Sequence, residues 1–189
     1  MNEALWESLR RFGALELPGW YLGGGCVPQT VWNLAHGKAP GADILDYDLV
    51  YFDADLSEGR EDMLTRQARA LVNDLPVALD VKNQARVHVW YPRRFGYEIA
   101  PYRSTEDAIA TWPTTASAIG VRPNGRGLEV YAPFGTDDLF DLVVRPNRAQ
   151  ITRAIYEAKV TRWVARWPSL TALPWDQGVG APRRPGAGP

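Results

Sequence analysis

The fold is decided by one stretch of the sequence, Asp46-Tyr47-Asp48-Leu49-Val50-Tyr51-Phe52. Two aspartates precede a continuous apolar run, which is typical of a strand that is buried on both faces. Residues i and i+2 of a strand point to the same face, so Asp46 and Asp48 are expected to project together. Two like charges so close repel each other unless something neutralises them. A divalent cation does so directly, because Mg²⁺ prefers a few carboxylates together with phosphate oxygens and water.

The same pair has an ordinary structural interpretation. An isolated Asp-x-Asp is more often a pair of solvated strand-edge aspartates, or it contains a turn residue at the position of Asp46. Here the rest of the strand is apolar, so two charges on one of its faces favour a functional site.

A glycine-rich turn lies before this strand. The apolar segment Trp20–Leu22 runs into Gly23, Gly24 and Gly25, and Pro28 suits the first turn of a following helix. Glycines permit positive φ and let a phosphate approach the backbone, and a helix N-terminus presents free N–H groups to it. Three glycines after a strand are as often only a tight turn. Nucleotide binding and simple turn formation therefore both remain open for this segment.

A third carboxylate follows in the next predicted strand, 77–81, which contains Asp80. A neighbouring strand would bring Asp80 to Asp46 and Asp48, as in two-metal sites with ions roughly 3.5–4 Å apart. Asp80 would also be placed to take a proton from an acceptor hydroxyl. The alternative is a structural ion pair of Asp80 with Lys82 or Arg86. Those two cations are also the candidates for contacting a triphosphate, Arg86 by its planar fork and Lys82 as a point charge.

The remaining pattern predicts one α+β domain, an α/β sandwich with a mixed central sheet flanked by helices. Segments 118–122 and 128–132 are expected to form a hairpin, and a closing helix is expected over about 147–167. The domain is expected to span residues 1–173. Residues 174–189 are rich in Pro, Gly and Arg and lack an apolar period, so we expect a disordered tail there.

Composition limits the classes of function. The 189 residues carry a formal net charge of −1, without the basic excess that binding to a long nucleic acid usually needs, so no extended nucleic-acid surface is expected. The single cysteine, Cys26, excludes an intrachain disulfide and a cysteine-based zinc site. No signal peptide and no apolar run long enough to span a bilayer is visible, so the cytoplasm is the expected compartment.

Several short motifs together resemble a known family. The motifs are Gly25-Cys26-Val27 through Val31-Trp32-Asn33, Asp46 to Asp53, Asn83-Gln84-Ala85-Arg86-Val87-His88, Trp112-Pro113 with Thr115-Ala116, and Ala132-Pro133-Phe134-Gly135 with Asp137-Asp138-Leu139-Phe140. Their order is similar to that in a bacterial nucleotidyltransferase-like family of the DNA polymerase β superfamily, and to the head domain of CCA-adding enzymes. The serine that many superfamily members carry at the turn is absent, and Pro28-Gln29 replaces the Arg-Asp of CCA-adding heads.

The resemblance implies a nucleotidyltransferase fold and a reaction. A nucleoside monophosphate would pass from a nucleoside triphosphate to an acceptor hydroxyl, with release of pyrophosphate and with two Mg²⁺ or Mn²⁺ ions as cofactors. By position, Asp46 and Asp48 match the metal-binding pair of the family, and Asp80 matches its third carboxylate.

Two other classes of function remain open at this point. One is a nucleotide-binding or antitoxin-like module with the same fold and little catalysis, although such a module would not need three carboxylates. The other is a metal-dependent phosphoesterase that uses the same acids to direct water. The acceptor of a transferase could be a small molecule, a protein hydroxyl or an RNA end.

Overall fold

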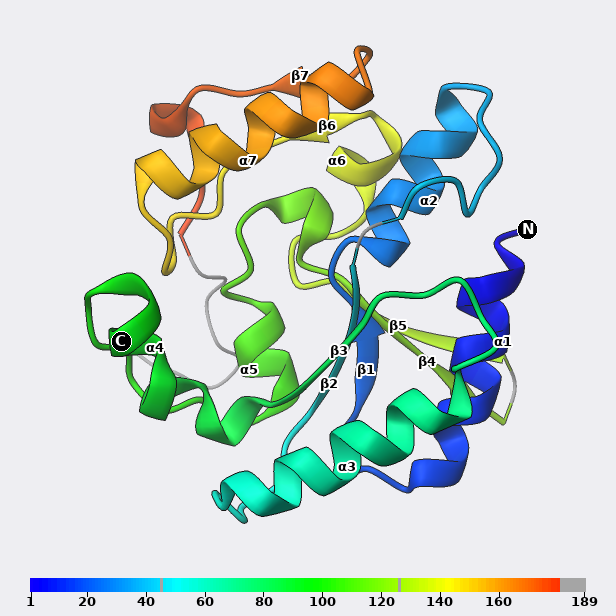
Figure 1. The fold of residues 1–189 in the computed structure, drawn as a ribbon. Coiled ribbons are helices and arrows are strands. Elements are labelled where there is room, and N and C mark those ends of the chain that lie inside the picture. The colour runs from blue at the N-terminus through cyan, green and yellow to red at the C-terminus, as the bar shows by residue number, and fades with distance from the viewer. Residues whose placement is uncertain (45, 126, 181–189) are drawn as a thin grey trace.

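The computed structural model describes residues 1–44, 46–125 and 127–180, and it contains a mixed five-stranded sheet in the order β3-β2-β1-β4-β5. The strands are β1 (Tyr21–Gly23), β2 (Tyr47–Tyr51), β3 (Leu79–Asn83), β4 (Gly120–Asn124) and β5 (Gly127–Tyr131). β2 and β3 are parallel, while β1 runs antiparallel to both β2 and β4. β4 and β5 form the predicted hairpin. The α+β class with a mixed sheet is confirmed (Figure 1).

Helices surround this sheet, and a small second sheet lies beside it. The α-helices are α1 (Glu3–Phe12), α2 (Cys26–Ala35), α3 (Glu58–Leu71), α4 (Val87–Phe95), α5 (Thr105–Ile109), α6 (Asp137–Phe140) and α7 (Arg153–Arg166). Short 3-10 turns are η1 (Gly13–Leu15), η2 (Gln84–Arg86), η3 (Thr115–Ser117) and η4 (Trp175–Gln177). The second sheet pairs β6 (Val143–Val144) with β7 (Thr171–Ala172) in parallel.

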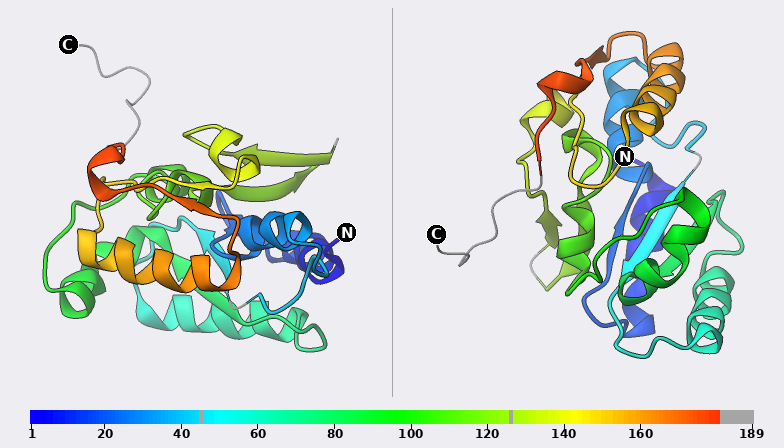
Figure 2. Two further views of the ribbon diagram at one scale, coloured as in Figure 1. Left: turned by 90° about the horizontal axis from the view of Figure 1, so that it is seen from above. Right: turned by 90° about the vertical axis from the view of Figure 1, so that its left-hand side faces the viewer.

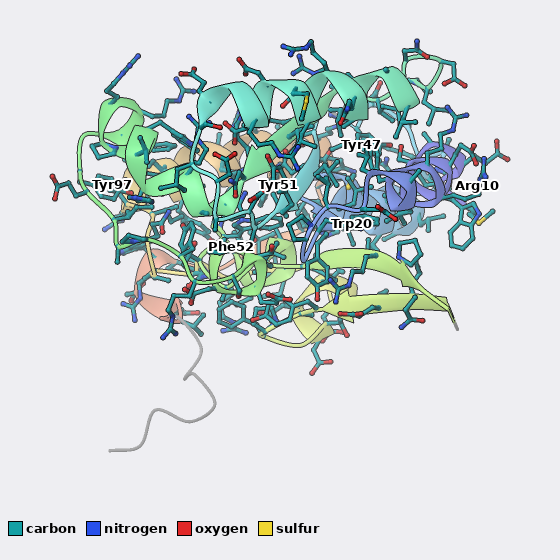
Figure 3. All side chains as sticks on the ribbon, turned by 90° about the horizontal axis from the view of Figure 1, so that it is seen from below. Arg10, Trp20, Tyr47, Tyr51, Phe52 and Tyr97 are labelled. Atoms are coloured by element: carbon teal, nitrogen blue, oxygen red, sulfur yellow. The ribbon has the colours of Figure 1, made fainter. Side chains whose placement is uncertain are left out.

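Both faces of β2 are covered, as the apolar run predicts. Tyr47, Leu49 and Tyr51 belong to a core that includes residues of α1 and α3. Figure 3 shows Tyr47 and Tyr51 between α3 and the sheet. Val50 points to the other face and packs with Ile109 of α5. Asp48 shares this second face with Val50, because side chains alternate along a strand.

A second core joins α2, α7 and the small sheet. Trp32 of α2 makes edge contacts with Trp163 and Trp167 of α7, at ring-centroid distances of 5.0 and 5.3 Å. Such aromatic pairs add specific geometry to the burial of apolar area. Figure 2 shows α7 lying next to α2 in both of its views. This packing brings α7 to the end of β2 that carries the aspartates.

The closing helix begins later than the predicted position near residue 147. α7 starts at Arg153, and the side chain of Thr152 caps it by accepting a hydrogen bond from the Ile155 N–H. The side chain of Asn147 instead donates to the carbonyls of Ala110 and Trp112, at 2.8 and 2.9 Å. These tertiary contacts hold Asn147 apart from the helix, so it does not open α7.

The segment after Pro174 differs from the disordered tail that the sequence predicts. Residues 175–177 form η4, and the Trp175 ring lies 5.9 Å from that of Tyr156. The Val179 N–H donates to the Pro146 carbonyl at 2.9 Å. The prediction of disorder therefore does not hold for 174–180, where one partly buried aromatic contact and backbone hydrogen bonds accompany a defined structure. The remaining predicted tail, 181–189, lies outside the described residues.

Within residues 1–44, 46–125 and 127–180, no helix combines the length and the apolar character needed to cross a membrane.

Candidate active site

Asp46 is held at the N-terminus of α2. Its Oδ2 accepts a hydrogen bond from the Gly25 N–H at 3.0 Å, and its Oδ1 accepts one from Gln29 Nε2 at 2.9 Å. The first donor is the backbone N–H of the N-cap residue and the second is a side-chain amide of the first turn, at a helix end where the dipole favours an anion. A carboxylate has about four acceptor positions, so two remain for another ligand.

Asp48 is the most strongly perturbed carboxylate of this region. Burial raises its pKa to about 7, and the charges of Asp46 and Asp80 add to the rise, while Lys159 and Lys82 oppose it. Among the described residues no hydrogen bond is donated to the Asp48 carboxylate, although its partly buried position would call for one. An acid that is buried, unpaired and close to two other acids is typical of a site that binds a cation.

The glycine turn, Gly23–Gly25, lies directly against these acids. A Cβ added at Gly24 would overlap the Asp48 carboxylate, and one added at Gly25 would overlap that of Asp46. Gly24 also has a φ of +72°, which L side chains rarely adopt. Glycine is therefore required because the carboxylates approach the backbone, a reason that the sequence alone did not indicate.

Asp80 lies opposite Asp48 in the parallel pair of β2 and β3. Neighbouring strands are about 4.8 Å apart, so both side chains lie on the same face at the same end of the sheet. The Asp80 side chain is 51% exposed and forms an ion pair with Lys82 at 2.9 Å, which is the structural alternative considered for it. No three acidic, histidine or cysteine side chains of the described residues are grouped closely enough to hold a metal ion together. Asp80 is thus adjacent to the pair of Asp46 and Asp48 but turned toward Lys82.

Arg86 is not among the residues that line the cavity of Asp46 and Asp48, where it would contact a triphosphate. It follows the C-terminal end of β3, whereas Asp80 is near the N-terminal end of that strand. Its guanidinium forms an ion pair with Glu61 of α3 and donates to the Leu56 carbonyl. Buried ionic groups of this kind need such partners, and they keep Arg86 under α3.

Lys159 of α7 is the residue that sequence reasoning missed. A cavity of about 110 Å³ is lined by Gly24, Gly25, Asp46, Asp48, Trp112, Pro113, Ser117, Lys159 and Trp163. Burial lowers the pKa of Lys159, and the charges of Asp46 and Asp48 oppose this effect. Its ammonium group also lies 4.9 Å from the centre of the Trp163 ring. In the sequence, Lys159 is one of several charges on a helix, and only the packing of α7 against α2 identifies it.

Comparisons with known proteins identify the fold and the family of the chain. A solved structure described as "The NMR structure of the protein reveals a CCA-adding enzyme head domain" matches with a TM-score of 0.74 and 26% identity, covering 92% of this chain and 91% of the other. No curated protein matches. A model of a nucleotidyltransferase family matches residues 10–172. The matched range includes the glycine turn, the three aspartates and Lys159, and the chain belongs to this nucleotidyltransferase family.

Proposed function

We propose that this protein transfers a nucleoside monophosphate from a nucleoside triphosphate to an acceptor hydroxyl, in the presence of Mg²⁺ or Mn²⁺, and releases pyrophosphate. One observation carries the proposal beyond family membership. Asp46 and Asp48 lie side by side at one end of β2, against the glycine turn and the N-terminus of α2. Carboxylates for a cation and the positive end of the α2 helix dipole, which favours a phosphate, are therefore close together.

Asp46 and Asp48 form a pair that fits a divalent cation, whereas no group of three acidic, histidine or cysteine side chains among the described residues does so. No described residue donates a hydrogen bond to Asp48, and its pKa of about 7 reflects burial next to two other acids. A positive charge at this position would remove the repulsion that raises the pKa. Asp46 and Asp48 would be the first ligands, with Asp80 joining them on release from Lys82. A bound pair of ions would supply electrostatic stabilisation of the developing charge on phosphate oxygens.

The chain's own groups have separable roles in this proposal. The acceptor oxygen attacks the α-phosphorus, the bond from that phosphorus to the α–β bridging oxygen breaks, and pyrophosphate leaves with the electron pair. Asp80 is exposed at the edge of the site and takes the proton of the acceptor hydroxyl. Lys159 lies across the cavity from the carboxylates and balances the negative charge of the phosphates. Lys82 restrains Asp80 through their ion pair.

The acceptor is a small molecule, a protein hydroxyl or an RNA end. An extended nucleic-acid duplex is a poor fit, because the chain carries a net charge of −1. The reaction can be tested by incubating the full chain with α-labelled nucleoside triphosphates, Mg²⁺ or Mn²⁺, and fractionated cell extract. We expect label on one fraction together with an equal amount of pyrophosphate.

The control for this experiment is Asp48→Asn, which removes the charge with little change of shape. It should abolish both labelling and pyrophosphate release, whereas Asp62→Asn on the exposed face of α3 should preserve them. Labelled monophosphate released without a labelled acceptor would identify a phosphoesterase instead. Binding of the triphosphate without either product, across all extract fractions, would identify a binding module.

A further inference from the structure

A second cavity adjoins the carboxylates on the side of α7. Its volume is about 230 Å³, and it is lined by Gln29, Asp46, Lys159, Arg162, Trp163, Arg166 and Trp167. Asp46, Lys159 and Trp163 also line the smaller cavity that contains Asp48. The two cavities therefore share walls, and we call the larger one the basic cavity.

Three cations of the basic cavity come from a single face of α7. Residues three, four and seven apart along a helix lie on the same side, which brings Lys159, Arg162 and Arg166 into line. The only acidic side chain among the residues that line the cavity is Asp46, at its junction with the smaller cavity. The charge balance of this space within the described residues is thus clearly positive, although the whole chain has a net charge of −1.

The three cations are not equally available to a ligand. Arg166 forms an ion pair with Asp43 at 3.3 Å and contacts the Trp167 ring. Lys159 is partly buried and lies over Trp163. Arg162 is exposed, and no carboxylate within the described part of the chain pairs with it. Arg162 and Lys159 are therefore the groups that can contact an incoming anion.

We propose that the basic cavity binds the β- and γ-phosphates of the nucleoside triphosphate, and that Arg162 is a binding residue for this pyrophosphate moiety. This inference rests on the proposed function, in which the α-phosphorus lies at Asp46 and Asp48. The β- and γ-phosphates must continue from that point into an adjoining space, and the basic cavity shares Asp46 with the carboxylate site. Guanidinium and ammonium groups are the side chains that bind terminal phosphates best.

The acceptor is the alternative source of a phosphate group for the basic cavity. A phosphate group on an acceptor molecule would present the same chemistry to Arg162. Its binding would be independent of the number of phosphates on the nucleotide, which separates the two sources. Affinity for inorganic pyrophosphate is the direct measure, because this probe contains the proposed moiety and nothing else.

The test measures binding of pyrophosphate, a nucleoside triphosphate and the matching nucleoside monophosphate to the full chain by titration calorimetry. Arg162→Gln should weaken binding of pyrophosphate and triphosphate about tenfold and leave the monophosphate unchanged, because one charge-assisted contact is lost. Arg162→Glu should weaken the first two further. Arg153→Gln is the matched control, since Arg153 is an exposed cation of α7 that pairs with Glu157 outside the basic cavity.

Two outcomes would overturn the inference: unchanged pyrophosphate affinity in both Arg162 variants, or an equal loss for the monophosphate. These outcomes are distinct from failure of the proposed function. If transfer activity is found while Arg162→Gln keeps wild-type affinity for pyrophosphate and triphosphate, only the inference fails. If Arg162→Gln weakens pyrophosphate selectively but no label is transferred, the inference stands and the transfer reaction is rejected.

Discussion

Asp48 is a carboxylate whose environment favours its neutral form. Its pKa rises from the ordinary 3.8 to about 7, first by burial and then by the neighbouring acids. In the metal-free protein the folded state therefore holds the proton more tightly than the unfolded state. The resulting cost in stability is absent below about pH 4, grows as the pH rises, and is complete above about pH 7.

The first prediction follows from this direction of the pH dependence of stability. In the presence of a metal chelator, Asp48→Asn should stabilise the protein at pH 8 and have a much smaller effect at pH 4.5. The pKa shift corresponds to a change of at most about 4 kcal/mol in the free energy of unfolding. We expect about half of this change, because water reaches the cavity. Urea unfolding of both proteins at the two pH values measures the difference. Destabilisation by Asp48→Asn at pH 8 would contradict the proposed state of this residue.

Gly24 offers a second test that changes a single residue of the candidate site. Gly24→Ala places a methyl group against the Asp48 carboxylate at a residue with positive φ. We expect a loss of about 1–3 kcal/mol of folding free energy and of metal-dependent nucleotide binding. Gly37→Ala is the matched control, because Gly37 has a φ of +65° but no atom near its added Cβ. Urea unfolding and nucleotide titration should show backbone strain in both variants but a binding defect only in Gly24→Ala. Equal nucleotide binding by the two variants would show that the glycine turn is not part of the nucleotide site.

At the scale of elements, the strands and the glycine turn were predictable because their signals are local. A continuous apolar run and a cluster of glycines each identify a structure within a few residues. Lys159 was not singled out and Arg86 was expected at the triphosphate, because the surroundings of both residues depend on distant partners. Arg86 pairs with Glu61, 25 positions earlier, and Lys159 reaches Asp48 only through the packing of α7 on α2. The carboxylates of the candidate site could be proposed from the sequence, whereas Lys159 required the fold.

The segment after α7 carries its own prediction. The Tyr156 hydroxyl donates to the Leu173 carbonyl at 2.7 Å, and the Trp175 ring packs on the Tyr156 ring. Trp175→Ala should lower the free energy of unfolding by about 1–2 kcal/mol, because a partly buried aromatic contact is lost. Trp6→Ala, at an exposed residue of α1, should have a much smaller effect. Thermal unfolding measures both variants, and equal melting temperatures would show that the segment after Pro174 contributes nothing to stability.

At the scale of the whole molecule, the site joins parts with separate cores. Asp48 belongs to the sheet that packs on α1 and α3, while Lys159 belongs to α7 in the second core. The glycine turn leads from β1 into α2 and connects the two. A ligand that contacts the carboxylates, the turn and α7 at once would therefore link both cores. A metal ion alone would contact only the acidic side.

The last prediction uses this arrangement. Mn²⁺ or Mg²⁺ together with a nucleoside triphosphate should raise the melting temperature more than the sum of their separate effects, because each ligand supplies contacts for the other. At a concentration 100 times the dissociation constant, the stabilisation is about 2.7 kcal/mol, which corresponds to about 5–10 °C for a chain of this size. Asp48→Asn should abolish the joint effect while Asp62→Asn retains it. Because metal-free Asp48→Asn is expected to be at least as stable as the wild type at neutral pH, its lack of response would reflect lost binding rather than a damaged fold. A full joint shift in Asp48→Asn would place the metal and the nucleotide elsewhere on the molecule, and it would remove the main support for the proposed reaction.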